Sequence, residues 1–412
     1  MNNLPWRRIL TVLIFVLLVL LIAFLLYWAF FGPENQPVGN NAISNGQLPN
    51  INGGVNRPVG NKNTSAGLPI TNESTAPSPT ANGGPTIVNP LVNTPTKYST
   101  LSGNGVDLIY YDPVTGKFYQ IDRNGMERRV LSDQVFKGLT NVAWSSSRQL
   151  AVLTFLDGRS IVYDFLNKQQ VSLPSELEEF SFSPDSTKIA AKYIGPVAND
   201  NWLAVVSSDG TSATQIEALG DKVSQVQVNW SPNSQIVATY QESIDGDRQA
   251  IVPLGAKNEN FKAIETNGRG FVGQYDRTGT RMLYSVYNST SSYNPELHIV
   301  EANGDSIGRN NINLSISTWA DKCAFGASGK EVYCAVPIGL SPGSGLYPEL
   351  ANEVPFEFMK IDVTTGLQQR LAQPTDADGI EQYSVGSVYL AGTEDVLYFT
   401  DPEGKVNTIK LE

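Results

Sequence analysis

The stretch FSPDSTKIAAKY at residues 182–193 is followed 48 residues later by WSPNSQIVATY at residues 230–240. In both stretches an aromatic residue precedes a Ser-Pro-Asp/Asn-Ser turn, and a second apolar run follows the turn. Turn residues between two apolar segments are typical of a β-hairpin. The repetition predicts that this chain uses one small β unit more than once.

The same pattern recurs about seven times in a more degenerate form. The aromatic or apolar residue before each turn is Leu101, Trp144, Phe182, Trp230, Tyr275, Phe325 or Tyr389. Along the chain, these residues are separated by 43, 38, 48, 45, 50 and 64 positions. Another apolar strand and a short closing strand follow each hairpin, as at 202–216, 296–308 and 357–371. Units of about 45 residues with four antiparallel strands are the blades of a β-propeller. The sequence therefore predicts an all-β propeller over residues 96–412, with seven blades favoured and six as the alternative.

The last unit raises the question of how the ring closes. It supplies only three strands before the chain ends, and an unpaired edge strand would promote aggregation. The apolar run nearest to the first unit is PTIVNPLV at residues 85–92. We expect this run to add the outer strand of the last blade; the alternative is that it belongs to a linker.

The hairpin motif also resembles a known group of propellers. An aromatic-Ser-Pro-Asp/Asn hairpin, an apolar strand and a D-x-x-T/D-G turn are similar to the units of TolB-like and WD-repeat-like propellers. The match is good at residues 182–191 and 230–239, whereas the Trp-Asp and Gly-His signatures of eukaryotic WD repeats are missing. The resemblance covers about three quarters of the chain and implies a protein-binding or scaffolding platform rather than a fixed chemistry.

Two segments precede the propeller. Residues 9–31 are 23 residues without a charge, long enough to span the hydrocarbon layer as one transmembrane helix, and they end in YWAFF rather than in the small residues of a cleavage site. Arg7 and Arg8 precede this run and the next basic residue is Arg57, which predicts a cytoplasmic N-terminus at residues 1–8 and an extracytoplasmic propeller. Residues 32–95 are rich in Asn, Gly, Pro, Ser and Thr, which predicts a disordered linker.

Two motifs match enzyme signatures but lack the expected context. Residues 339–343 fit G-x-S-x-G, yet no helix is predicted after them, and the only histidine, His298, lies in an alternating strand where we expect a structural role. Residues 268–273 fit G-x-G-x-x-G but lead into a strand instead of opening a helix, so we expect a loop between blades. One histidine and two cysteines do not form the usual zinc-ligand sets, and we expect neither a cofactor nor a metal.

The two cysteines stand in one predicted hairpin. If its turn centres on Ser328 and Gly329, Cys323 and Cys334 face each other on antiparallel strands, where the Cα separation suits a disulfide. An extracytoplasmic location favours the bond, and two buried thiols are the alternative.

The charge of the predicted propeller excludes one class of partner. Residues 99–412 hold 24 of the 29 basic and 38 of the 40 acidic residues, a net formal charge of −14. Nucleic-acid binding requires clustered Lys and Arg, so we do not expect a nucleic-acid partner.

Long loops are predicted at four equivalent positions. Each connects the second strand of a unit to its third, at residues 194–201, 242–249, 288–295 and 337–355, and equivalent loops emerge on one face of a propeller. Loops on a rigid scaffold commonly carry binding sites. The candidate binding residues on this face are Asp200, Asp245, Asp247, Tyr293, Tyr347, Glu349 and Glu353.

The sequence thus predicts a membrane-anchored, extracytoplasmic propeller that binds a protein or cell-envelope component and has no catalytic residues. The alternative is a polysaccharide-active lyase or hydrolase, or a propeller that assists a peptidase. A cleft that gathered Glu242 and the candidate acidic residues with Tyr293 and Tyr347 would favour the enzyme. Structural calcium in the Asp-rich loops is a third hypothesis, although no complete ligand loop is present.

Overall fold

The computed structural model describes residues 17–21, 76–257, 259 and 261–411. Two compact units are separated, Met1–Ile70 and Thr71–Glu412. In the first unit residues 17–21 are helical, while the rest of the predicted span at 9–31 lies outside the described residues. No helix in the described part of the chain is both long and apolar enough to cross a membrane.

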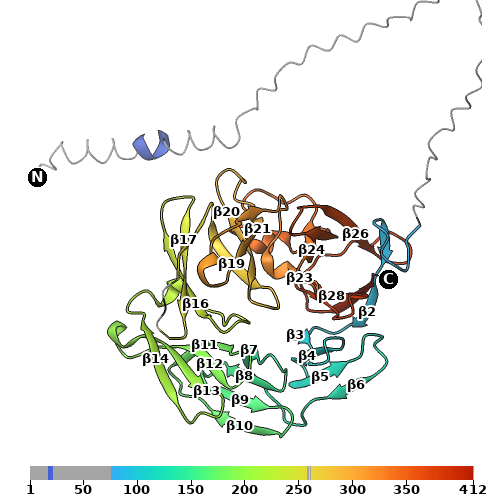
Figure 1. Ribbon diagram of the computed structural model, residues 1–412. Coiled ribbons are helices and arrows are strands. Elements are labelled where there is room, and N and C mark those ends of the chain that lie inside the picture. The colour runs from blue at the N-terminus through green and yellow to red at the C-terminus, as the bar shows by residue number, and fades with distance from the viewer. Residues whose placement is uncertain (1–16, 22–75, 258, 260, 412) are drawn as a thin grey trace, which may run out of the picture. The chain divides into compact units, whose positions relative to one another are not determined.

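The second unit is a seven-bladed β-propeller, as predicted, and Figure 1 shows its sheets arranged in a ring. The first blade contains β3 (Lys97–Leu101), β4 (Leu108–Asp112), β5 (Lys117–Ile121) and β6 (Arg128–Val130). The second contains β7 (Leu139–Trp144), β8 (Leu150–Phe155), β9 (Ser160–Asp164) and β10 (Gln169–Ser172). The third contains β11 (Leu177–Phe182), β12 (Lys188–Tyr193), β13 (Trp202–Ser207) and β14 (Ala213–Ala218).

The remaining blades repeat this order along the chain. The fourth contains β15 (Val226–Val228), β16 (Ile236–Ser243), β17 (Gln249–Gly255) and β18 (Ile264–Thr266). The fifth contains β19 (Arg269–Tyr275), β20 (Arg281–Tyr287), β21 (Glu296–Glu301) and β22 (Ile312–Asn313). The sixth contains β23 (Cys323–Phe325), β24 (Glu331–Pro337), β25 (Phe356–Asp362) and β26 (Gln368–Thr375), and the seventh contains β27 (Val388–Leu390), β28 (Val396–Thr400) and β29 (Val406–Lys410).

The repeated phrase of the sequence forms the turn between the first and second strands of each blade. In the third blade Ser183 N donates to Lys188 O at 2.8 Å, and Ser186 N donates to Ser183 O at 2.9 Å with Ser186 at φ 63°. All seven blades contain this pair of bonds, and a residue with positive φ ends each turn: Gly105, Arg148, Ser186, Ser234, Gly279, Gly329 and Glu394. A type I turn followed by a left-handed residue suits a tight hairpin.

The turn bonds correct one position of the sequence alignment. In the last blade Ala391 N donates to Val396 O, so that Leu390, not Tyr389, is equivalent to Phe182. Leu390 is buried in the core, whereas Tyr389 directs its hydroxyl to Ser99 O at 2.8 Å. The sequence alignment was therefore one residue out of register in the last blade.

The ring closes through the residues that precede the first blade. β2 (Asn89–Val92) pairs antiparallel with β29 and supplies the outer strand of the last blade, which confirms the expected closure for this half of residues 85–92. β1 (Pro85–Ile87) instead pairs parallel with β26 of the sixth blade, so the closing segment contacts two blades. Strand structure therefore begins within the segment 32–95 that composition assigns to the linker, and residues 32–75 lie outside the described residues.

The apolar core lies between neighbouring blades. Seven clusters of buried residues occupy the seven interfaces, including one that joins the last blade to the first through Tyr398 and Tyr110. Val92 of β2 belongs to that closing cluster. Each blade thus buries both of its faces only when both neighbours are present.

The connections between strands define two faces. The long-loop face carries the loops between second and third strands and the links between blades, including η1 (Ala198–Asp200), η2 (Val223–Gln225), η4 (Ala320–Lys322) and η5 (Pro348–Ala351). The turn face carries the hairpin turns and the connections between third and fourth strands, with η3 (Gly304–Ser306).

Candidate functional site

The loops that connect the second and third strands of the fourth, fifth and sixth blades are joined to one another by hydrogen bonds. Together these three loops form a ledge on the long-loop face. Ser289 of the fifth blade donates its backbone N–H at 3.0 Å and its hydroxyl to the carboxylate of Asp247 in the fourth blade. The loop of the sixth blade bonds to the fifth, since Gly343 N donates to Ser292 O and Gly345 N donates to Tyr293 O, both at 2.8 Å. These bonds fix the three loops relative to one another.

Tyr293 and Tyr347 lie on the two bonded loops of the fifth and sixth blades. Their residue exposures are 42% and 58%, so both rings are accessible on the ledge. Tyr293 adopts φ 58°, a conformation that non-glycine residues rarely take, and its N–H donates to Asn288 O at 2.8 Å. Leu346 and Leu350 lie beside Tyr347 in sequence and are also exposed.

The acidic candidate residues differ in their hydrogen-bond and ion-pair partners. Asp245 pairs with Arg248 at 2.8 Å within its own turn, and this hydrogen bond lowers the pKa of Asp245 below its usual range. Asp247 bonds to Ser289, as described above. Glu242 is exposed near the end of strand β16, and Glu349 and Glu353 are exposed on the ledge loop of the sixth blade, with Glu349 in the first turn of η5.

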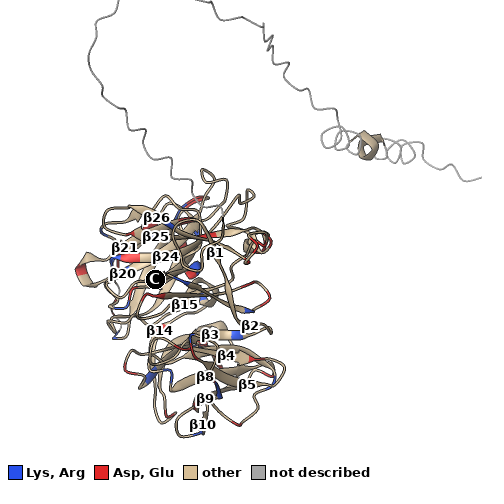
Figure 2. Cartoon of the chain, turned by 90° about the vertical axis from the view of Figure 1, so that its right-hand side faces the viewer, with Lys and Arg blue, Asp and Glu red and all other residues tan. Residues whose placement is uncertain are grey.

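Asp200 is separate from this group. It is exposed at the end of η1 in the loop of the third blade, which is held by its own bonds between Asn201 and Gly195 and between Asn201 and Gly220. Among the described residues, no hydrogen bond or ion pair joins this loop to the ledge loops. In Figure 2 acidic residues are spread over loops on both sides of the ring.

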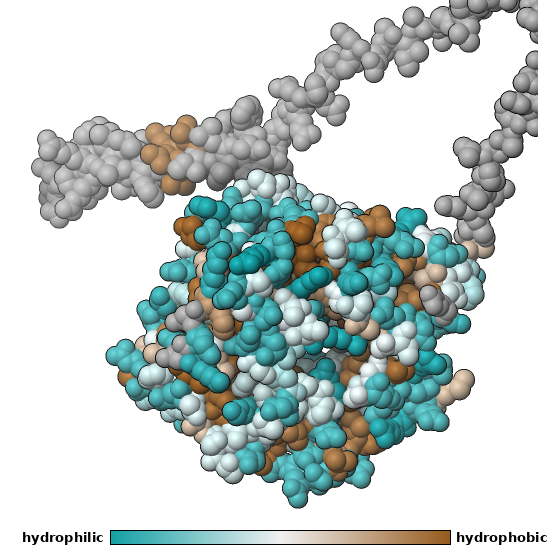
Figure 3. Space-filling view, viewed as in Figure 1, coloured by the Kyte–Doolittle hydropathy of each residue, from teal (hydrophilic) through white to brown (hydrophobic). Residues whose placement is uncertain are grey.

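Exposed apolar side chains also concentrate on the long-loop face, which the sequence reasoning did not foresee. Of sixteen large exposed apolar residues described in the propeller, eleven lie there: Val114, Val135, Leu156, Val197, Ile244, Tyr293, Ile338, Leu346, Tyr347, Leu350 and Ile380. Only Met126, Leu166 and Leu367 lie on the turn face. The available signal was an apolar residue inside a short polar turn, such as Val114 in DPVTG. Figure 3 shows apolar patches among hydrophilic side chains on the face that it displays.

The remaining sequence motifs have structural roles. Cys323 and Cys334 are directly opposite each other on β23 and β24 and form the predicted disulfide. Residues 268–273 enter strand β19, and residues 339–343 lie in the ledge loop of the sixth blade. His298 is buried in β21 against Tyr284, with ring centroids 5.0 Å apart. Among the described residues, no group of three or more His, Cys, Asp and Glu side chains is placed to hold a metal ion.

No protein-family model and no curated protein matches the chain. Among solved structures, an oligogalacturonate lyase in complex with manganese is similar, with 13% identity, TM-score 0.51, and 78% of this chain and 90% of that chain covered. Two others are the Cps50 (Swd1) propeller domain of Myceliophteria thermophila (13% identity, TM-score 0.49, coverage 79% and 99%) and TolB of Acinetobacter baumannii (12% identity, TM-score 0.42, coverage 64% and 62%). At these identities the likeness shows the propeller fold alone.

Proposed function

We propose that this chain is a non-catalytic binding module that captures a protein or cell-envelope component on the long-loop face of its propeller. The observation that supports this proposal is the unequal distribution of exposed apolar side chains, eleven on this face against three on the turn face. Concentrated apolar exposure in a folded protein is typical of interaction surfaces. Tyrosine is a favoured anchor, because its large ring loses little rotamer entropy on binding.

The ledge of the fourth to sixth blades is the centre of the proposed surface. Its loops are held by bonds between blades, so a partner would meet a preformed surface and little loop ordering would oppose binding. The exposed carboxylates Glu349 and Glu353 would favour a basic partner and would act mainly on the association rate at low salt.

A photo-crosslinking experiment tests this proposal. A benzophenone amino acid placed at position 347 in cells should yield a defined adduct, whereas the same probe at Met126 on the turn face should not. With the adduct partner purified, Tyr347→Ala should weaken binding about 30-fold, which corresponds to about 2 kcal/mol for a buried anchor. Leu367→Ala, which removes an exposed apolar side chain from the turn face, should leave binding unchanged.

The opposite pattern would refute the proposed face. Adducts formed from position 126 and not from position 347, together with weakened binding in Leu367→Ala, would place the partner on the turn face. Thermal unfolding of both variants should match the wild type, because exposed loop positions contribute little to the core.

We further propose that residues 9–31 anchor the chain in a membrane, with the propeller on the extracytoplasmic side. Support comes from the 23-residue apolar run, the basic residues before it, and the Cys323–Cys334 disulfide, since such bonds persist mainly in oxidising compartments.

The enzyme alternative uses the same face. It requires acidic groups gathered in a cleft, whereas Asp245 and Asp247 are engaged in loop bonds and Asp200 lies on the separate loop of the third blade. Incubation with uronate-containing oligosaccharides separates the two functions, because a lyase would generate absorbing unsaturated ends and a binding module would not.

A further inference from the structure

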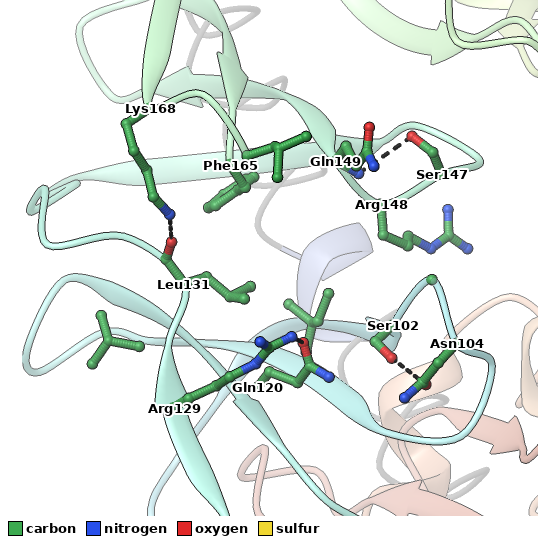
Figure 4. A pocket seen from close by; sticks show the side chains of 14 residues that line it. Ser102, Asn104, Gln120, Arg129, Leu131, Ser147, Arg148, Gln149, Phe165 and Lys168 are labelled. Carbon is green, nitrogen blue, oxygen red and sulfur yellow. Dashed lines mark hydrogen bonds between the residues drawn. The ribbon is translucent and has the colours of Figure 1, made fainter.

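A cavity of about 470 Å³ opens on the turn face between the first and second blades, away from the ledge. Figure 4 shows the side chains around it, which come from segments far apart in sequence: the hairpin turns of both blades, the outer strands of the first, and the third-to-fourth connection of the second. One side is apolar, with Phe165 buried and Leu131 beside it. The opposite side carries the amides and hydroxyls of residues such as Gln120 and Ser102.

Three cationic side chains line this cavity and no acidic side chain does: Arg129, Arg148 and Lys168. Their hydrogen-bond partners are neutral oxygens. Arg129 donates to Gln120 Oε1 at 2.7 Å, Arg148 donates to Leu101 O at 3.2 Å and Ser145 O at 2.6 Å, and Lys168 donates to Leu131 O. Within the described part of the chain, none of the three forms an ion pair with a carboxylate.

Two carboxylates, Asp107 and Asp164, hydrogen-bond to residues that line the cavity, and Asp164 also interacts electrostatically with Lys168. Asp107 accepts hydrogen bonds from Gln120 Nε2 at 2.6 Å and Asn104 Nδ2 at 2.8 Å. Asp164 accepts bonds from the backbone N–H groups of Leu166 and Asn167 within its own turn. The cavity is therefore a local concentration of positive charge in a propeller whose net formal charge is −14.

Arg148 is the most informative of the three cations. It occupies the left-handed position of its hairpin turn at φ 60°, where three other blades carry glycine and two carry serine. Burial lowers the pKa of its guanidinium, and the bonds to Leu101 O and Ser145 O leave several of its five N–H donors available. Because every blade has a positive-φ residue at this position, the conformation belongs to the hairpin turn, and the unused N–H groups of the guanidinium are what a ligand would meet.

We propose that this cavity binds a small ligand that carries a carboxylate or phosphate group beside an apolar or aromatic part. The guanidinium of Arg129 and the ammonium of Lys168 would hold the anion, because Arg offers paired donors that match such oxygens, and Arg148, which Figure 4 shows on the other side of the cavity, would add to the positive potential that attracts it. Phe165 and Leu131 would contact the apolar part. This site lies on the turn face and does not depend on the function proposed for the long-loop face.

Benzoate and benzamide form a matched pair of probes for the full chain. Both have the same ring and shape, and only benzoate is charged. Calorimetry should give benzoate a dissociation constant on the order of 1 mM, and benzamide should bind at least about tenfold more weakly. Raising the salt concentration should weaken benzoate binding and leave benzamide unaffected. Phenyl phosphate and inorganic phosphate tell whether phosphate is preferred and whether the ring contributes.

Two variants locate the site. Arg148→Gly should still fold, since glycine accepts φ 60°, although the bonds to Leu101 O and Ser145 O are lost, and it should lower benzoate affinity about threefold by removing a nearby positive charge. Lys168→Ala should act in the same direction. The control is Arg159→Ala on the long-loop side of the same blade, whose side chain pairs with Asp157 at 2.7 Å, and it should bind benzoate normally. Equal binding of the two probes, or unchanged benzoate affinity in both cavity variants, would overturn the proposal.

Discussion

At the scale of single residues, His298 makes the stability of the propeller depend on pH. It is 6% exposed, its Nε2 has no hydrogen-bond partner within the described structure, and burial lowers its pKa to about 4. In the unfolded chain the imidazole has its ordinary pKa near 6.5. Between these values the unfolded state binds more protons, so stability is complete above about pH 6.5 and is lost as the pH falls towards 4. The loss amounts to about 3 kcal/mol.

The change that tests this is His298→Phe, which keeps a ring against Tyr284 and removes the titration. Chemical denaturation at several pH values should show a falling free energy of unfolding for the wild type between pH 6.5 and 4, and a smaller fall for the variant. Other groups, such as the buried Asp321 whose pKa is raised by burial, contribute equally to both proteins and cancel in the difference. Parallel curves would mean that His298 is not held neutral. The chain has only one histidine, so the assignment is direct.

The residue scale also shows why the contacts of the candidate binding side chains were harder to predict than the blades. The side chains of Ser183 and Asp185 accept hydrogen bonds from backbone N–H groups of the same turn. Such local bonds can be predicted from the residues of the turn alone. Asp247 was predicted as a binding residue, and in the structure its carboxylate accepts a bond from Ser289 that joins two blades and has no local signature. The cavity around Arg148 combines segments separated by tens of residues, which only the closed ring brings together.

At the scale of elements, the hairpin of β23 and β24 is closed by the Cys323–Cys334 disulfide, whose two residues are 2% and 0% exposed. The bond closes a short loop, so the chain-entropy argument limits its contribution to about 3 kcal/mol. The double variant Cys323→Ala/Cys334→Ala should lower the free energy of unfolding by up to this amount, plus a cost for the cavity left in the core. Alkylation of the unfolded, unreduced wild type should find both sulfurs blocked. Two alkylated thiols in protein from its native compartment would contradict the bond.

The strands were predicted correctly where the turn residues gave a strong signal, and they were misaligned where the turn residues gave a weak one. The third and fourth blades have Ser-Pro-Asp/Asn-Ser turns, and their hairpins were placed correctly. The last blade has Ala391 and Glu394 at the first and last turn positions, without the serine and aspartate signals, and there the alignment shifted by one residue. The pairing of β1 with the sixth blade was not predicted. β1 pairs parallel with β26, and no hairpin turn in the sequence marks a parallel pair.

At the scale of the whole molecule, the remaining question is on which side of a membrane the propeller lies. Arg7 and Arg8 precede the apolar run and the next basic residue after it is Arg57, so the positive-inside rule predicts a cytoplasmic N-terminus for the proposed membrane anchor. Protease added to spheroplasts should therefore cut within residues 32–75 and release a fragment that contains the propeller, since closely packed blades resist cleavage. The released fragment should migrate faster without reductant, because the Cys323–Cys334 bond remains closed. A cytoplasmic marker protein must stay intact in the same sample. Full protection of the chain until the cells are lysed would place the propeller in the cytoplasm and would remove the oxidising compartment on which the disulfide depends.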